Sequence, residues 1–149
     1  TDNVMRLHPD GKLWIHSGDV GYMDEDGFLY IKGRIKRMIT MYDGHKVIPV
    51  QLEGIFGKHP DVEACAVVGA KDPTHVQGEV PILYVKLNPG ADRETAEKEI
   101  KAIYNDIELR SLPYDLVFID EMPREGMGKI AYQQLSDLYN EKQDQAKAV

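Results

Sequence analysis

The sequence predicts an α+β fold in which a small β-hairpin region precedes a compact domain with a three-stranded sheet and flanking helices. Short strand-like runs separated by turn residues fill the first third of the chain, and three longer strand-like runs follow. Segments in which apolar residues recur at helical spacing lie beside those longer runs. The chain has 149 residues, of which 42% are hydrophobic, so it can fill one core of this size.

The first 32 residues carry only short strands. Residues 12–16, which include Trp14, follow an Asp10-Gly11 turn, and residues 20–23 and 28–32 form a hairpin around a turn that ends in Asp26-Gly27. A few short strands bury too little apolar surface to be stable alone. We therefore expect their apolar face to be partly exposed and to favour self-association of the isolated chain.

Residues 33–53 join this region to the rest of the chain. Arg34, Lys36 and Arg37 precede an apolar segment, a turn around Gly44 and a strand over residues 46–48. A basic cluster followed by a glycine-tipped hairpin can present cations and backbone N–H groups to phosphate. A solvated turn is the other interpretation, and the residues of this segment alone leave both open.

The compact domain is expected to begin with a helix over residues 49–59, because proline is tolerated at the first helical position. Apolar strands follow over residues 62–70 and 79–87, joined by a polar loop. Pro81 near the start of the second strand suggests that this strand lies at a sheet edge.

The last third of the chain is predicted to contain two helices and a strand. Asp92 is a candidate N-cap for a helix that ends at Arg110, and residues 114–120 form the third strand. A glycine-bearing loop over residues 123–129 leads to a short amphipathic helix. Its apolar positions are Ala131, Leu135, Leu138 and Tyr139. The charged tail over residues 141–149 is expected to fray.

Composition excludes several classes of function. The net charge of −7 argues against a general nucleic-acid-binding protein. The sequence shows no membrane span and no signal peptide, and the single cysteine, Cys65, is expected to be a buried core thiol in a cytoplasmic protein. The histidines lack metal-ligand spacing, so we expect no metal site in this chain. Those considered are His8, His16, His59 and His75.

Three short motifs carry possible chemistry: Ser17-Gly18-Asp19, Gly33-Arg34-Ile35-Lys36 and Gly126-Met127-Gly128-Lys129. Each motif alone is typical of an ordinary turn or a solvated loop. Together they supply an acceptor for hydroxyl groups, a basic bend and a lysine on a loop that glycine can make mobile.

Five blocks, in order, resemble the C-terminal end of adenylate-forming (AMP-binding) enzymes. They are HSGDVGYMDEDGFLYIKGRIKRMI, DGHKVIPVQLE, HPDVEACAVVGAKD, GEVPILYVKL and PREGMGKIAYQQL. This superfamily contains acyl-CoA synthetases, adenylation domains of peptide synthetases and luciferases. The resemblance implies that a carboxylate and MgATP give an acyl-adenylate and pyrophosphate, and that the thiol of CoA then displaces AMP. It favours an acid–thiol ligase of the acyl-CoA synthetase type.

The resemblance also assigns roles to individual residues. Asp19 is similar to the aspartate that accepts hydrogen bonds from the ribose hydroxyls of ATP, and Arg34 to an arginine that reaches the nucleotide. Lys36 resembles the hinge residue about which the small domain rotates. Lys129 resembles the catalytic lysine that contacts the carboxylate and the α-phosphate.

Residues of the glycine-tipped hairpin are assigned to the second step. Gly44, His45 and Lys46 resemble the hairpin that lines the passage for the pantetheine arm of CoA, and Lys46 is also placed near the nucleotide. The run Ile130-Ala131-Tyr132-Gln133-Gln134 departs from the family, where more basic residues follow the lysine. The resemblance therefore does not predict how the phosphates of CoA are held.

The resemblance implies a domain division as well. Residues 1–35 would be the last strands of a large N-terminal domain, and residues 36–140 would be the mobile C-terminal domain. The large domain would bind the acid substrate and supply most of the ligands of Mg²⁺. Without that partner domain the chain is expected to be inactive. Two alternatives remain, namely an adenylation domain that loads a carrier protein and a non-catalytic module that binds a nucleotide or a partner.

Overall fold

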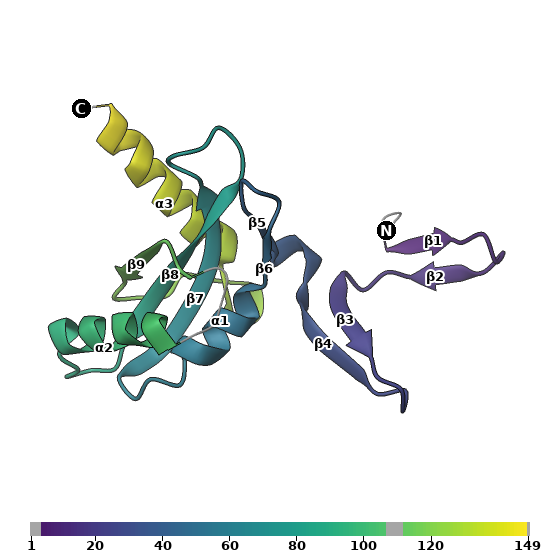
Figure 1. The fold of residues 1–149 in the computed structure, drawn as a ribbon, viewed down its shortest axis with the longest axis horizontal. Coiled ribbons are helices and arrows are strands. Elements are labelled where there is room, and N and C mark those ends of the chain that lie inside the picture. Colours follow the sequence, from purple (N-terminus) through teal and green to yellow (C-terminus); the bar gives the residue numbers. More distant parts are fainter. Residues whose placement is uncertain (1–3, 107–111, 149) are drawn as a thin grey trace.

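A computed structural model describes residues 4–106 and 112–148 and confirms the predicted α+β fold (Figure 1). Its centre is a three-stranded sheet in the order β7 (Val62–Lys71), β8 (Glu79–Leu87) and β9 (Asp115–Phe118). Strands β7 and β8 are antiparallel, whereas β8 and β9 are parallel. A parallel pair needs a crossover connection, and α2 (Arg93–Asp106) lies within it.

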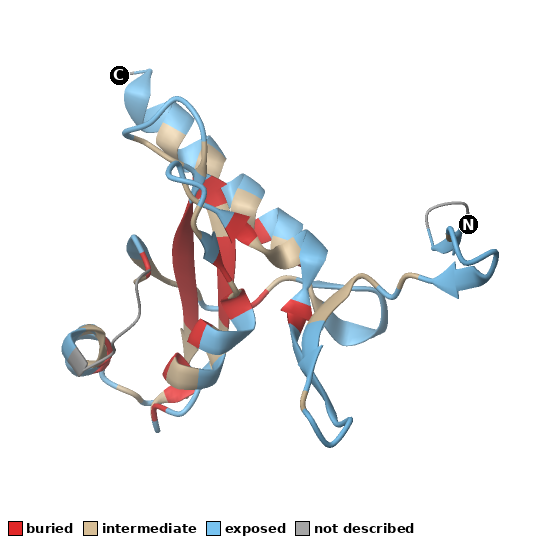
Figure 2. Cartoon of the chain, turned by 45° about the vertical axis from the view of Figure 1, so that its right-hand side comes forward, coloured by how far each residue is buried: buried red, intermediate tan, exposed pale blue. Residues whose placement is uncertain are grey.

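Helices cover both faces of this sheet. Strand residues alternate between the two faces, so Val67 packs in one apolar cluster with Phe56 of α1 (Pro49–Phe56) and Ile100 of α2. Its neighbour Ala66 packs in the other cluster, with Leu135 of α3 (Tyr132–Lys147). The buried residues concentrate in the sheet and the helix faces against it (Figure 2). Burial on both faces explains why the strand sequences are almost continuously apolar.

The edge position expected for the strand that contains Pro81 is wrong, because β8 is the central strand. The carbonyl oxygen of Pro81 accepts a hydrogen bond from the backbone N–H of Tyr114 at 2.7 Å. Within a strand the N and C=O of one residue point to the same side, so the missing N–H of Pro81 faces the start of β9. Proline therefore removes no hydrogen bond from the β7–β8 ladder.

The helix starts agree with the sequence better than the helix ends do. Pro49 begins α1 as expected, but the helix ends at Phe56 and not at residue 59. Asp92 is confirmed as the cap of α2, since its Oδ2 accepts the backbone N–H of Thr95 at 2.9 Å. The end expected for this helix at Arg110 lies outside the described residues.

The C-terminal tail continues as part of α3 as far as Lys147, where fraying from residue 141 was expected. The Oδ1 atom of Asn140 accepts the backbone N–H of Lys71 at 2.9 Å, and Lys71 lies 4.0 Å from Asp144. Alanine, glutamine, glutamate and lysine also favour helix. These contacts and propensities explain the longer helix.

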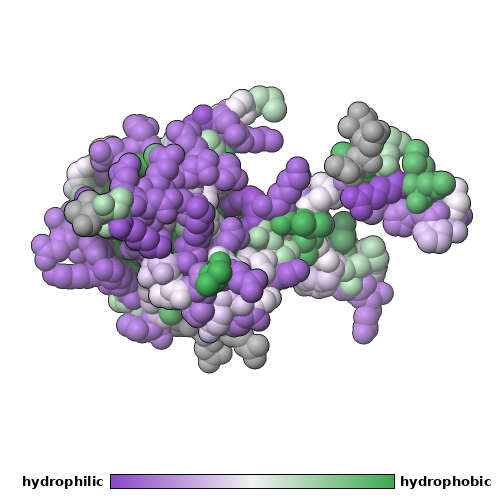
Figure 3. Space-filling model, turned by 90° about the horizontal axis from the view of Figure 1, so that it is seen from above, coloured by the Kyte–Doolittle hydropathy of each residue, from purple (hydrophilic) through white to green (hydrophobic). Residues whose placement is uncertain are grey.

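The N-terminal region forms two hairpins beside the sheet domain, β1 (Met5–Leu7) with β2 (Leu13–Ile15) and β3 (Asp19–Met23) with β4 (Leu29–Arg34). Their apolar side chains are exposed, as expected: Leu7 is 74% exposed and Phe28 65%. On the face that Figure 3 shows, hydrophobic surface gathers over these hairpins, whereas the sheet domain is mostly hydrophilic. No helix in the described ranges has the length and apolar character to cross a membrane.

Candidate functional site

Asp19 and Arg34, which the sequence predicts as nucleotide contacts, lie together. Pairing of β3 with β4 sets Asp19 opposite Arg34, and Arg34 Nη1 lies 3.1 Å from Asp19 Oδ1. The Asp19 side chain keeps 27% of its surface exposed and that of Arg34 keeps 60%. Both line an open hollow of about 670 Å³, which Lys36 also borders. A carboxylate and a guanidinium are thus presented side by side to a ligand.

Lys36 lies where the hairpins meet the sheet domain. It is the exposed middle residue of a single 3₁₀ turn, η1 (Ile35–Arg37). Before this turn, Ile35 donates its backbone N–H to the Gly18 carbonyl at 2.8 Å, which ties it to the β3–β4 hairpin. After it, Ile39 of β5 (Ile39–Thr40) is 1% exposed in the main core. Lys36 therefore lies between two anchored segments.

Gly44 and His45 lie in the turn between β5 and β6 (Lys46–Val47), and Lys46 is the first residue of β6. The Met41 backbone N–H donates to the His45 carbonyl at 2.8 Å, and Gly44 adopts a left-handed φ of +81° that favours glycine. The turn is therefore a defined hairpin tip.

A second loop, over residues 72–78, supports this tip. The ring of His75 stacks on Tyr42 with centroids 3.6 Å apart. Gly78 has φ +97°, and a Cβ there would lie 2.4 Å from the Tyr42 backbone nitrogen. The sequence correctly predicts a polar loop here, but nothing in the sequence predicts its contact with a hairpin some 30 residues away.

Asp72 organises that loop, so the loop should loosen in strong acid. Burial would raise the pKa of Asp72, but hydrogen bonds from Thr74 and His75 outweigh it and lower the pKa from 3.8 to about 2. Because the carboxylate is favoured in the fold, its stabilisation is complete above about pH 4 and is lost as the pH falls through 2. The Thr74 amide resonance should titrate with a midpoint near 2 and stop titrating in Asp72→Asn. A midpoint at 3.8 would contradict this assignment.

Lys129 lies on a short hairpin, where the sequence predicted a loop. Strands β10 (Arg124–Glu125) and β11 (Lys129–Ile130) pair around the 3₁₀ turn η2 (Gly126–Gly128). The Gly128 carbonyl accepts a hydrogen bond from Arg124 Nη1 at 2.6 Å. The Lys129 side chain is exposed and forms no ion pair with any other described residue. It does not line the hollow beside Asp19, so the structure joins Asp19 with Arg34 and leaves Lys129 on a separate turn.

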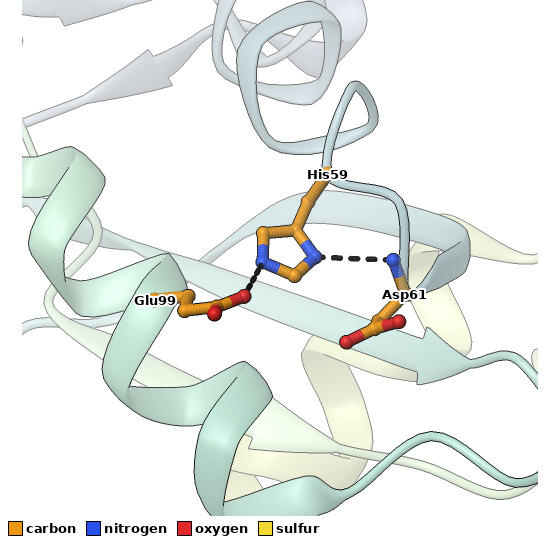
Figure 4. A group of neighbouring side chains, drawn as sticks. All are labelled: His59, Asp61 and Glu99. Atoms are coloured by element: carbon orange, nitrogen blue, oxygen red, sulfur yellow. Dashed lines mark hydrogen bonds and ion pairs between the residues drawn. The ribbon is translucent and has the colours of Figure 1, made fainter.

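His59, Asp61 and Glu99 form a polar cluster between the end of α1 and α2 (Figure 4). The backbone N–H of Asp61 donates to His59 Nδ1 at 3.2 Å, and Nε2 lies 2.9 Å from Glu99 Oε2. Because Nδ1 accepts a hydrogen bond, Nε2 carries the proton and donates it to Glu99. A cation on Nε2 would have to displace that proton. Hydrogen bonding, which the sequence allowed for His59, therefore accounts for this cluster.

Cys65 is a half-buried thiol and should be slow to alkylate. Burial, helped by the negative charge of Glu53, raises the pKa of its thiol from 9.0 to about 11. The raised pKa keeps Cys65 protonated at pH 8, and the reactive thiolate grows only as the pH approaches 11. Two pKa units correspond to about 100-fold less thiolate, so iodoacetamide labelling in the native protein should be about 100-fold slower than after denaturation in urea. Equal rates in the two states would contradict this.

Comparison with known proteins places this chain in a family and identifies similar ligases. A family described as the AMP-binding enzyme C-terminal domain matches residues 51–129. The chain is 42% identical over 132 residues to 4-coumarate–CoA ligase-like 9 of Oryza sativa subsp. japonica, which covers 86% of this chain and 22% of that protein. It is 35% identical over 127 residues to the fatty acid–[acyl-carrier-protein] ligase ScoC of Streptomyces coeruleorubidus, covering 85% and 24%.

A solved structure shares the fold. ATP-bound MatB from Rhodopseudomonas palustris superimposes with a TM-score of 0.72 at 27% identity, over 90% of this chain and 25% of that one. The chain therefore spans between 22% and 25% of the length of these relatives.

Proposed function

The chain belongs to the family of AMP-binding enzyme C-terminal domains, and we propose that it is the C-terminal portion of an ATP-dependent carboxylate–CoA ligase. One observation carries the proposal: the paired Asp19 and Arg34 and an exposed Lys129 occur in a chain with CoA ligases among its relatives. In such a ligase, a carboxylate attacks the α-phosphate of ATP, pyrophosphate leaves, and the CoA thiol then displaces AMP from the acyl-adenylate.

Asp19 and Arg34 suit the nucleoside end of the adenylate. The Asp19 carboxylate is partly exposed and opens on the hollow, so it can accept hydrogen bonds from two adjacent ribose hydroxyls. Arg34 holds the carboxylate in place and leaves most of its own side chain open to the ligand. Lys46, on the β5–β6 hairpin, is a further cation that we assign to the nucleotide.

Lys129 is the residue we assign to adenylation. Its exposed ammonium on a narrow hairpin can enter a site formed by a partner domain and offset the charge that develops on the α-phosphate. The Mg²⁺ that accompanies ATP would be held mainly by that partner domain. Rotation about Lys36 would then move Lys129 out of the active site and bring in the turn of Gly44 and His45, which would line the passage of CoA.

The exposed apolar hairpins support a division of the chain at the hinge. Residues 1–35 would complete the larger domain of the ligase, and residues 36–140 would be the mobile domain. Large side chains such as Leu7, Ile15 and Phe28 are more than half exposed in this chain. Surface of this kind marks an interface, and here the occupant we assign is the larger domain. Alone, the chain would self-associate and would not complete the reaction.

The proposal is tested with the longer protein that the complete coding sequence encodes. It is incubated with ATP, Mg²⁺, CoA and a panel of carboxylic acids, and acyl-CoA and AMP are detected by mass spectrometry. We expect equal amounts of AMP and acyl-CoA with at least one acid, and a strongly raised KM for ATP in Asp19→Ala. ATP consumption with no acyl product from any acid would contradict the proposal.

A second acceptor is a carrier protein, because one relative is named as an acyl-carrier-protein ligase. The same assay separates the two, since holo-carrier protein can replace CoA. Acyl-carrier product without acyl-CoA would establish the second function.

A further inference from the structure

Arg37, the residue after the proposed hinge, is fixed on three sides. Its Nη2 donates to Glu53 of α1 and, at 3.4 Å, to the Val67 carbonyl of β7. Only 18% of the Arg37 side chain and 15% of that of Glu53 are exposed. Glu53 Oε1 also accepts the Val67 backbone N–H at 2.9 Å. An ion pair with this little solvent and this many hydrogen bonds holds both side chains in one geometry.

The third side of Arg37 contacts the segment that carries Lys129. The guanidinium carbon lies 3.6 Å from the ring centre of Tyr132, which is stacking distance. Tyr132 is the first residue of α3, three positions after Lys129 at the start of β11. Lys36, Arg37 and Tyr132 also line one cleft of about 130 Å³, so the hinge and the start of α3 are neighbours.

Helix α3 is itself held firmly on the sheet, so Tyr132 is a fixed point. Ser136 Oγ donates to the Gly69 carbonyl at 2.5 Å, and Tyr84 Oη donates to the Leu135 carbonyl at 3.0 Å. Leu135 is fully buried. Tyr132 therefore has a defined position on the sheet. Its contact with Arg37 links the residue after the proposed hinge to that position.

We infer that Arg37 is a positioning residue that fixes the orientation of the Lys129 hairpin relative to the hinge through its contacts with Glu53 and Tyr132. This inference rests on the proposed function for its catalytic readout. Its consequence is that rotation is confined to Ile35 and Lys36, since Ile35 is tied to Gly18 and Arg37 to the sheet domain. A lysine at position 37 would not suffice, because its compact ammonium lacks the planar face with which the guanidinium stacks on the Tyr132 ring while its N–H groups pair with Glu53.

The test compares Tyr132→Leu with Tyr132→Phe in the longer protein, because phenylalanine keeps the ring face and leucine removes it. Arg37→Lys is the second variant. Two measurements are made on each protein. Hydrogen–deuterium exchange over residues 124–132 reports how often the backbone N–H groups of the hairpin open to solvent, and so how firmly the hairpin is held, independently of catalysis. Pyrophosphate exchange and thioester formation from preformed acyl-adenylate report the two half-reactions separately.

Tyr132→Leu and Arg37→Lys should lower the kcat of adenylation about 10-fold, with KM for ATP within about two-fold. Thioester formation should stay within about two-fold, because Lys129 does not act in it, and deuterium uptake over the Lys129 hairpin should rise. Tyr132→Phe should restore wild-type behaviour. An equal fall in both half-reactions, or unchanged uptake in Tyr132→Leu, would overturn the inference. If the wild-type protein shows no pyrophosphate exchange, the proposed function fails while deuterium uptake still decides the role of Arg37.

Discussion

Replacing Lys129 with alanine should lower carboxylate-dependent adenylate formation by the longer protein about 100- to 1000-fold. The physical reason is that Lys129 is expected to supply a positive charge where negative charge develops on the α-phosphate. An exposed lysine on a turn bears little on folding, so the loss should appear in kcat with the unfolding midpoint unchanged. Single-turnover formation of the acyl-adenylate, followed by mass spectrometry, measures the effect.

The matched control is Lys142→Ala, which removes the same charge from the exposed side of α3. Its rate should stay within about two-fold of wild type. Adenylation retained in Lys129→Ala, or lost equally in Lys142→Ala, would mean that Lys129 has no special role.

Replacing Phe56 with alanine should lower the free energy of unfolding by about 3 to 5 kcal/mol. Phe56 is completely buried at the end of α1, and its ring meets Tyr104 edge-on with centroids 5.4 Å apart. Removing the ring leaves a cavity between α1, α2 and the sheet, which these packed elements cannot fill by collapsing. Urea unfolding of the 149-residue chain, followed by circular dichroism, measures the loss.

Val76→Ala is the control, because it truncates an apolar side chain that is fully exposed on the loop over residues 72–78, outside the hairpins that are expected to self-associate. It should change the unfolding free energy by about 0.5 kcal/mol or less. Equal losses in the two variants would contradict the core that the structure describes.

Where local chemistry alone decides an element, the sequence was sufficient to predict it. The apolar runs of β7 and β8 predict strands because a strand covered on both faces is apolar at nearly every central position. Asp92 predicts the start of α2 because its side chain caps an N–H only three residues away. The edge position predicted from Pro81 was wrong because the sequence does not show which side of β8 the proline nitrogen faces. It faces the start of β9, so the β7–β8 ladder loses no hydrogen bond.

The candidate site likewise contains residues that the sequence predicted and contacts that it did not. Asp19 and Arg34 were predicted from the resemblance, and the β3–β4 register then places them opposite each other. The contacts of Arg37 with Glu53 and Tyr132 were not predictable, since they join segments from three parts of the chain. Basic residues after Gly33 are compatible with many surfaces, and only the fold determines that one of them, Arg37, is largely shielded from solvent.

The most direct test of the central claim is carboxylate-dependent exchange of labelled pyrophosphate into ATP by the longer protein, measured without CoA. This exchange isolates the adenylation step, so it does not depend on which acceptor takes the acyl group. We predict exchange with at least one carboxylic acid and its loss in Lys129→Ala. A folded longer protein that binds ATP but shows no exchange with any acid tested would contradict the assignment of this chain to an adenylate-forming ligase.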